Sequence, residues 1–457
     1  MVVAVLFTAL QGCTDRNRGV SRTALDEYVA APDPSYRYEV ARKTAGEGYV
    51  SYLVELTSQS WLSSNEVDRT LWKHWLVIVR PSEVRSSKAL LFISGGLNGE
   101  PAPKQVDERM VKTALATNSV VAELMMVPNQ PLKFAGETRE LSGEALMAYS
   151  WDKFLRTDDS RWPLILPMTK AAVRAMDTIT AICRLPQSEP LNIDSFVVAG
   201  NSKRGWTAWT TAAVDKRVVA LVPLVSDMLN VKPSFVHQRE AYGFLSPALA
   251  EYEALGIMDW QGTPEYRKLL TIVEPFEYRK RLTMPKYVIN ATGDQFFLPD
   301  SSQFYFRELR KPKWLRYVPN TEHSLSGSDA WNALVAFYDA ILEGRPIPDY
   351  TWDMEDDGSI RVKTRDDPIH VRLWQASNLN ARDFRVNSIG RAWKSSEITK
   401  GVDGVYVGRV AVPEQGWTAF MVELVFEHRP FPFKFTTSVR VLPEVLPFKY
   451  TPGSPPE

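Results

Sequence analysis

The sequence is poor in the residues and motifs that accompany metal or nucleotide chemistry. It has two cysteines and five histidines in 457 residues. It contains no C-x-x-C, H-E-x-x-H or EF-hand pattern, and neither G-x-G-x-x-G nor G-x-x-x-x-G-K-[ST], the glycine-rich turns that hold dinucleotides and phosphates. We therefore expect no metal and no nucleotide cofactor.

A net charge is also missing. The 54 basic side chains balance the 54 acidic ones, so no overall positive field favours nucleic acid as a partner. The length suggests two or three domains, and a hydrophobic content of 44% can build a large core for each. Fourteen tryptophans and 31 prolines suit a loop-rich hydrolase of the cell envelope or the secreted fraction, with β modules.

The two cysteines have different settings. Cys13 follows a short apolar run in Leu-Gln-Gly-Cys, which resembles a bacterial lipoprotein signal whose cysteine becomes lipidated. The run is too short to span a bilayer, so any membrane attachment would be through a lipid anchor. A plain cleaved signal peptide, or no targeting segment, are the alternatives. Cys183 lies in an apolar-periodic helix and is expected to be buried, which leaves no intrachain disulfide if Cys13 is lipidated.

The order of strands and helices predicts an α/β domain over residues 36–346. Apolar strands alternate with helices, which implies right-handed βαβ units and a mostly parallel sheet covered by helices on both faces, after an antiparallel start. Residues 131–160 form a polar, aromatic insertion, and residues 229–282 a helical cap. Strands are expected at residues 49–56, 70–80, 89–94, 119–127, 196–199, 217–225, 286–291 and 314–318, and helices at 104–117, 162–185, 207–214 and 330–342.

The segments before and after the α/β domain have sequence patterns that differ from it. Residues 1–13 are the signal or lipobox, and residues 14–35 a polar tether. Residues 350–447 predict an all-β, Ig-like sandwich that could bind a polymer or a protein partner, and residues 448–457 a tail. The sandwich strands are expected at residues 359–364, 369–375, 383–387, 404–412, 417–426 and 434–442.

Residues 195–215, SFVVAGNSKRGWTAWTTAAVD, organise the rest of the chain. They read as a strand, a tight turn with Ser202 at its tip, and a helix, which is the form of a nucleophile elbow. Gly200 lies two residues before the serine. The position two residues after it, where glycine is usual, is Arg204, and Gly205 follows. The other interpretation is an ordinary serine in a βα turn.

Ser202, Asp294 and His323 follow one another in the nucleophile–acid–histidine order of the α/β-hydrolases, each just past the end of an expected strand. Active sites of open α/β sheets gather at that edge. A serine hydroxyl needs a neutral imidazole to remove its proton, and a carboxylate fixes the imidazole tautomer. Asp227 and Asp300 are alternative acids, although Asp300 could instead cap a helix.

The oxyanion of such a site needs two N–H donors. We expect one from the backbone of Lys203 and the other from Gly96 or Leu97, in the turn after the first parallel strand. Candidates for the substrate pocket are Asn98, Arg204 and Trp206.

Three strings together are distinctive: TSQSWLSSNEVDRTLWKHWLVIVRP, GNSKRGWTAWTTAAVDKRVVALVPLV and NATGDQFFLPDSS. They resemble the PhoPQ-activated pathogenicity-related family, which also includes a secreted eukaryotic repressor of cell proliferation. The resemblance covers about residues 35–445. It implies an α/β-hydrolase-like core, an envelope or secreted location and a link to virulence, without a substrate. The elbow is also similar to those of glucuronoyl-type carbohydrate esterases, which carry a basic residue after the serine.

The leading hypothesis is a serine hydrolase with Ser202 as nucleophile, His323 as base and Asp294 as orienting acid, acting on a peptide or an ester. A carbohydrate esterase is the second hypothesis. The third is a binding or signalling protein that keeps the hydrolase scaffold without its reaction.

Overall fold

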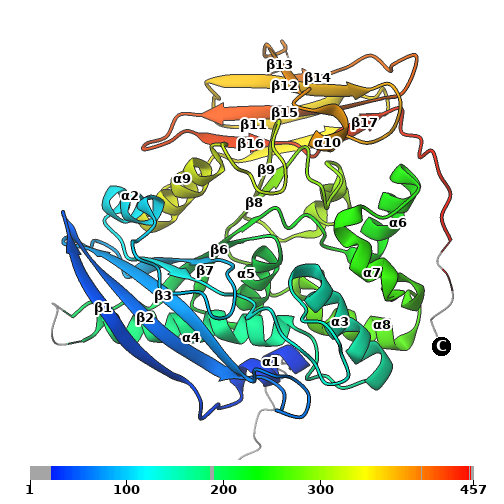
Figure 1. The fold of residues 1–457 in the computed structure, drawn as a ribbon. Helices are drawn as coiled ribbons and strands as arrows, with labels where there is room; N and C mark the ends of the chain where they lie inside the picture. The colour runs from blue at the N-terminus through cyan, green and yellow to red at the C-terminus, as the bar shows by residue number, and fades with distance from the viewer. Residues whose placement is uncertain (1–21, 186–189, 403, 452, 454–457) are drawn as a thin grey trace, which may run out of the picture.

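One nine-stranded sheet carries the hydrolase part of the chain. The computed structural model describes residues 22–185, 190–402, 404–451 and 453 (Figure 1), so the expectation for Cys13 and its apolar run lies outside the described residues. Across the sheet, the strands are β1 (Arg37–Gly46), β2 (Tyr49–Ser60), β3 (Leu71–Pro81), β5 (Val121–Leu124), β4 (Lys88–Ile93), β6 (Ser195–Asn201), β7 (Val218–Leu224), β8 (Lys286–Ala291) and β9 (Lys313–Val318). Strands β1, β2, β3 and β5 pair antiparallel, and β5 through β9 pair parallel, as expected.

Helices cover both faces of the parallel strands. Successive residues of β6 show this, because Val197 and Val198 pack into different hydrophobic clusters. The cluster of Val198 includes α4 (Ile165–Cys183) and α5 (Lys203–Val214), and that of Val197 includes α2 (Glu108–Thr117) and α9 (Ala330–Glu343), as Figure 1 shows. The uninterrupted apolar runs of β4, β6 and β8 follow from this two-sided burial.

Three segments differ from the expectation. In the expected tether, α1 (Ala24–Ala30) forms with a capping box of Thr23 and Asp26 and buries Leu25 completely. The expected insertion contains α3 (Gly143–Thr157), and the strand expected at residues 383–387 is replaced by α10 (Val386–Ile389). In this last case the Asp383 carboxylate accepts a hydrogen bond from the Arg385 N–H at 3.1 Å, and such a local turn competes with an extended strand.

Helical segments cover the carboxyl edge of the parallel strands. They are α6 (Val231–Tyr242), η1 (Pro247–Leu249), α7 (Ala250–Ala254), η2 (Ile257–Trp260), α8 (Pro264–Val273) and η3 (Pro275–Tyr278). Helix α3 packs against α7, α8 and η2, so the insertion and residues 229–282 form one cap.

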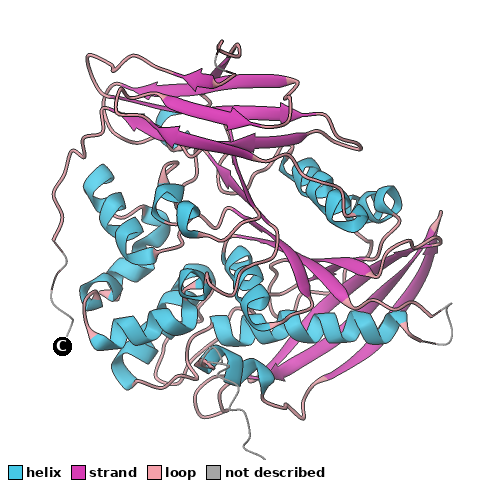
Figure 2. Cartoon of the chain, turned by 180° about the vertical axis from the view of Figure 1, so that it is seen from behind, coloured by secondary structure: helices cyan, strands magenta, loops and turns pink. Residues whose placement is uncertain are grey.

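The C-terminal part consists of two antiparallel sheets (Figure 2). One contains β10 (Tyr350–Met354), β11 (Ile360–Thr364) and β14 (Tyr406–Gly408); the other contains β13 (Lys394–Glu397), β12 (His370–Asn378), β15 (Trp417–Phe426), β16 (Phe433–Thr436) and β17 (Arg440–Leu442). They pack on β9 and α9, and the Tyr317 N–H donates to Thr436 Oγ1 at 2.9 Å. Within the described residues, no helix has the length and apolar character to cross a membrane.

Candidate active site

Ser202 adopts the strained backbone of a nucleophile elbow between β6 and α5. Its φ is 58° and its ψ is −128°, a region that residues with a side chain rarely occupy and that clusters at active sites. The Ser202 N–H donates to Leu224 O at 2.8 Å, which ties the turn to β7. The observed geometry thus matches the strand–turn–helix form expected from residues 195–215.

Steric contacts explain why arginine is tolerated two residues after the serine. A Cβ on Gly200 would lie 2.7 Å from Arg204 O, and a Cβ on Gly205 would lie 2.8 Å from Ser226 Cβ. These two positions therefore need glycine. The Arg204 side chain instead leaves the turn toward the loop after β5, where it donates to Val127 O.

Asp294 and His323 form a hydrogen-bonded pair at the ends of β8 and β9. His323 Nδ1 lies 2.8 Å from Asp294 Oδ2 and 2.9 Å from Oδ1, and the Asp294 side chain is 2% exposed. Asp294 Oδ1 also accepts the Phe296 N–H at 2.7 Å. Because a carboxylate accepts, Nδ1 carries the proton, and Nε2 is left as the acceptor.

Nε2 of His323 is buried and has no hydrogen-bond partner among the described residues. The structure accordingly contains no hydrogen bond between this nitrogen and Ser202 Oγ. The Phe296 ring lies 4.1 Å from the His323 ring, centroid to centroid, and Phe296 also lines the cavity that Ser202 lines. Catalytic hydrogen bonds often tighten only in the substrate complex, so this arrangement is compatible with a base close to the serine.

The alternative acids have other partners. Asp227 accepts hydrogen bonds from Tyr305 at 2.5 Å and from Tyr317 at 2.6 Å. Burial raises the pKa of Asp227 to about 8, although both tyrosine hydroxyls lower it. Asp300 binds His237 at 3.0 Å and Arg382 at 2.6 Å. Of the three candidates, only Asp294 is hydrogen-bonded to His323.

Backbone N–H groups are available for an oxyanion. Gly96 has a φ of +141°, which requires glycine, and the N–H groups of Gly96 and Leu97 have no partner among the described residues. Lys203 is the first residue of α5, so its N–H has no intrahelical acceptor and lies at the positive end of the helix dipole. We refer below to residues 95–97 as the 95–97 loop.

A small cavity of about 30 Å³ lies beside Ser202. Its walls are mainly apolar and come from the elbow, α3, the cap and the loops after β7 and β8. Across it, Lys203 Nζ pairs with Glu144 Oε1 at 2.6 Å, and Tyr252 donates to Glu144 Oε2 at 3.0 Å. The lining residues are Glu144, Met147, Ser202, Lys203, Trp206, Ser226, Met228, Leu249, Tyr252, Phe296 and Phe297.

Of the three residues expected in the substrate pocket, one lines the cavity and two do not. Trp206 lines the cavity, whereas Asn98 and Arg204 lie outside its lining. The side chain of Asn98 instead donates to Pro131 O at 2.9 Å. Glu144 and Tyr252, which the sequence reasoning missed, come from the insertion and the cap, where no local motif marks them.

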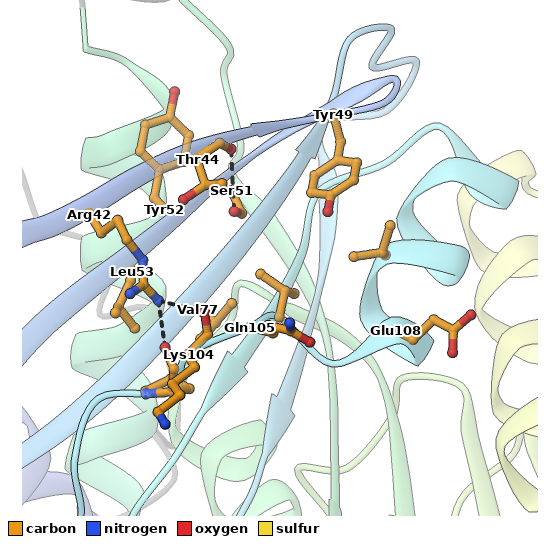
Figure 3. Close-up of a pocket in the computed structure, with 13 residues that line it drawn as sticks. Arg42, Thr44, Tyr49, Ser51, Tyr52, Leu53, Val77, Lys104, Gln105 and Glu108 are labelled. Carbon is orange, nitrogen blue, oxygen red and sulfur yellow. Dashed lines mark hydrogen bonds between the residues drawn. The ribbon is translucent and has the colours of Figure 1, made fainter.

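A larger groove of about 430 Å³ lies elsewhere, between β1–β3 and the loop before α2 (Figure 3). Arg42 reaches from β1 to Lys104 O at 3.3 Å, and Tyr49 and Tyr52 also line the groove. None of Ser202, Asp294 and His323 lines it. In the described parts of the chain there is also no group of three or more His, Cys, Asp or Glu side chains placed to hold a metal ion.

Three known proteins are similar to parts of this chain of different length. Autocrine proliferation repressor protein A of Dictyostelium discoideum is 37% identical over 93% of this chain and 92% of its own length. Acetyl esterase Axe7A of Xylanibacter ruminicola is 27% identical over 34% of this chain and 31% of its own length. Among solved structures, acetyl xylan esterase 1 from Thermoanaerobacterium sp. covers 70% of this chain and 93% of its own, at 13% identity and a TM-score of 0.47.

The family match covers the whole hydrolase part and the start of the C-terminal sheets. The sequence profile described as PhoPQ-activated pathogenicity-related protein matches residues 25–385. This range contains Ser202, Asp294 and His323, so the residues of the candidate site are part of the matched region. The chain belongs to the PhoPQ-activated pathogenicity-related protein family.

Proposed function

We propose that the protein is a serine esterase that hydrolyses esters of small, uncharged acyl groups. The observation that carries the proposal is the Asp294–His323 pair, whose Nε2 is left without a partner at the same sheet edge as the strained Ser202. The partial similarity to a protein named an acetyl esterase supports an ester rather than a peptide.

In the proposed reaction, Ser202 Oγ attacks the ester carbonyl while His323 Nε2 takes the hydroxyl proton. The carbonyl oxygen becomes an oxyanion held by the Lys203 N–H and by Gly96 or Leu97. The imidazolium, which Asp294 stabilises, then gives its proton to the departing alcohol, and an acyl-serine remains. Water, deprotonated by Nε2, attacks this ester, and the proton returns to Ser202 as the carboxylic acid leaves. The Ser202–His323 hydrogen bond forms when substrate fills the cavity.

The size of the cavity limits the acyl group. The cavity is small, at about 30 Å³, so a short acyl group should fit better than a long one. An acetyl group fits this space. The Lys203–Glu144 pair leaves no net charge on the lining, so nothing there compensates a charged acyl group.

A fluorophosphonate probe and a substrate panel test the proposal. The wild type should be labelled, Ser202→Ala should not, and p-nitrophenyl acetate should be hydrolysed faster than the butyrate. Peptide p-nitroanilides should be turned over slowly or not at all. Equal labelling of wild type and Ser202→Ala would reject the nucleophile, and faster turnover of the anilides would make the protein a peptidase.

A second candidate is a signalling protein that keeps the scaffold without the reaction. The relative named a proliferation repressor is similar over nearly its whole length, and the Ser202–His323 hydrogen bond is absent among the described residues. This candidate is the correct one if the wild type reacts neither with the probe nor with any ester of the panel.

We also propose an envelope or secreted location. The sequence Leu-Gln-Gly-Cys at residues 10–13 supports a lipid anchor, and the family's name suggests a role in virulence.

A further inference from the structure

The Arg204 side chain connects the nucleophile elbow with the 95–97 loop. Its Nε donates to Val127 O. A Cβ built on Gly95 would lie 2.5 Å from Nη2 and 3.0 Å from Cζ of the same guanidinium. The planar group therefore rests directly on the backbone of Gly95, and the absence of a side chain at that position makes the close approach possible.

The two segments that Arg204 contacts, at Gly95 and at Val127, are hydrogen-bonded to each other. The Met126 N–H donates to Gly95 O at 2.8 Å, and the Val127 N–H donates to Ser94 O at 3.1 Å. The start of the 95–97 loop and residues 126–127 are thus joined by backbone hydrogen bonds. A guanidinium can contact both at once because its donors are fixed in a plane, which an ammonium group cannot reproduce.

The charge of Arg204 is attracted by Glu144 only from beyond ion-pair distance. Among the described residues, no carboxylate lies within ion-pair distance of it, whereas the neighbouring Lys203 pairs with Glu144 at 2.6 Å. Burial lowers the pKa of Arg204, since desolvation disfavours the charged form. A half-buried cation without an ion-pair partner costs stability. The guanidinium lies at Gly95, next in sequence to the unpartnered N–H groups of Gly96 and Leu97, where the proposed reaction develops negative charge.

On the basis of the proposed function, we propose that Arg204 is a positioning residue for the oxyanion site. It holds the 95–97 loop against the elbow, so that N–H groups from the loop and from Lys203 reach the same oxygen. Its positive charge opposes that of the Glu100 carboxylate, which lies near Gly96, and so contributes to the field at that oxygen.

Substitutions of Arg204 test this role, because a positioning residue should affect kcat and leave KM nearly unchanged. Arg204→Met should lower kcat for p-nitrophenyl acetate about 10²-fold, comparable to the loss of an oxyanion donor, with KM nearly unchanged. Arg204→Lys keeps the charge but not the two contacts and should fall between. Added guanidinium should restore part of the kcat of Arg204→Ala. Arg217→Lys, at the far end of α5 where Arg217 binds Asp215, is the matched control and should behave as wild type.

Gly95→Ala disrupts the same contact between Arg204 and Gly95 by changing the glycine instead of the arginine. The new Cβ would meet the end of a flexible side chain, with Arg204 Nη2 at 2.5 Å, so the guanidinium has to move while the fold is kept. The variant should lose kcat as Arg204→Met does. Because both substitutions break one contact, the double variant should be little worse than either single variant.

A measurement without turnover separates this proposal from the esterase proposal. Hydrogen exchange of a peptide covering residues 94–100 should be faster in Arg204→Met and Gly95→Ala than in wild type, and unchanged in Arg217→Lys. Unchanged exchange with kcat within about twofold of wild type would overturn the proposal. A rise in KM alone would make Arg204 a substrate-binding residue instead. If the wild type shows no esterase activity, the function proposed above fails, and the exchange rates still decide whether Arg204 holds the loop.

Discussion

Replacing Asp294 with asparagine tests the candidate site most directly. Asp294 Oδ1 accepts the Phe296 N–H at 2.7 Å, and Oδ2 faces His323 Nδ1 at 2.8 Å. In Asp294→Asn, the amide oxygen has to stay on the Phe296 N–H, because that donor has no other acceptor. The amide NH₂ then takes the place of Oδ2, 2.8 Å from Nδ1, and favours the tautomer with the proton on Nε2, in which His323 cannot accept a proton from Ser202.

The expected loss of kcat can be bounded from the hydrogen bonds of Asp294 to Phe296 and to His323. Rotating the amide to restore the productive tautomer leaves the Phe296 N–H unpaired, at about 1–3 kcal/mol, and the lost charged bond to the imidazolium is worth about 1.5–3 kcal/mol. Together these give about 2.5–6 kcal/mol, or about 10²- to 10⁴-fold in kcat at roughly 1.4 kcal/mol per factor of ten. KM should change little, since Asp294 is 2% exposed and does not line the cavity.

The assay is steady-state hydrolysis of p-nitrophenyl acetate, with circular dichroism to show that the variants are folded. Asp227→Asn is the matched control, because Asp227 is the rival acid one strand earlier and is bound by tyrosines instead. The reasoning is refuted if Asp294→Asn keeps kcat within about tenfold of wild type, or if Asp227→Asn loses more.

Three further predictions concern the cavity, the core and the N-terminus. Leu249→Ala should raise the butyrate-to-acetate ratio of kcat/KM, because Leu249 is a buried wall of the cavity, and should lower the unfolding free energy in urea by about 2–5 kcal/mol. Asp227, with its pKa raised to about 8 by burial, stabilises the fold fully below its ordinary pKa near 4, and this stabilisation is lost as the pH rises toward 8. The unfolding free energy of the wild type should therefore fall more between about pH 5 and pH 8 than that of Asp227→Asn; parallel curves would contradict this. In a bacterial host, labelled palmitate should be incorporated into the wild type and not into Cys13→Ala.

The fold and much of the site geometry could be predicted because their causes are local in the sequence. A serine on a tight strand-to-helix turn demands small residues at fixed places, and Gly200 and Gly205 supply them. Strand ends are visible as breaks in apolar runs, and the carboxyl ends of parallel strands meet at one edge. The pairing of Asp294 with His323 follows from that rule, although each lies on a different strand.

Other features depend on contacts that no local pattern encodes. Glu144 and Tyr252 meet across the cavity from the insertion and the cap, more than a hundred residues apart, and nothing beside either residue indicates the other. The helix α1 is a different case, because the capping box of Thr23 and Asp26 was present in the sequence but lay inside a polar stretch interpreted as a tether. The polarity of the stretch was outweighed there by the capping box and by the burial of Leu25.

The two basic residues after Ser202 have opposite environments, and this difference bears on the chemistry. Lys203 is neutralised by Glu144 at the cavity, whereas Arg204, beside Gly95, forms no ion pair with any described residue. Charge is therefore cancelled on the side of the acyl group, whereas on the side of the N–H donors the Arg204 guanidinium lies at Gly95 and the Glu100 carboxylate lies near Gly96. In the esterase reaction proposed above, the N–H donors would act on the negative charge that develops on the carbonyl oxygen.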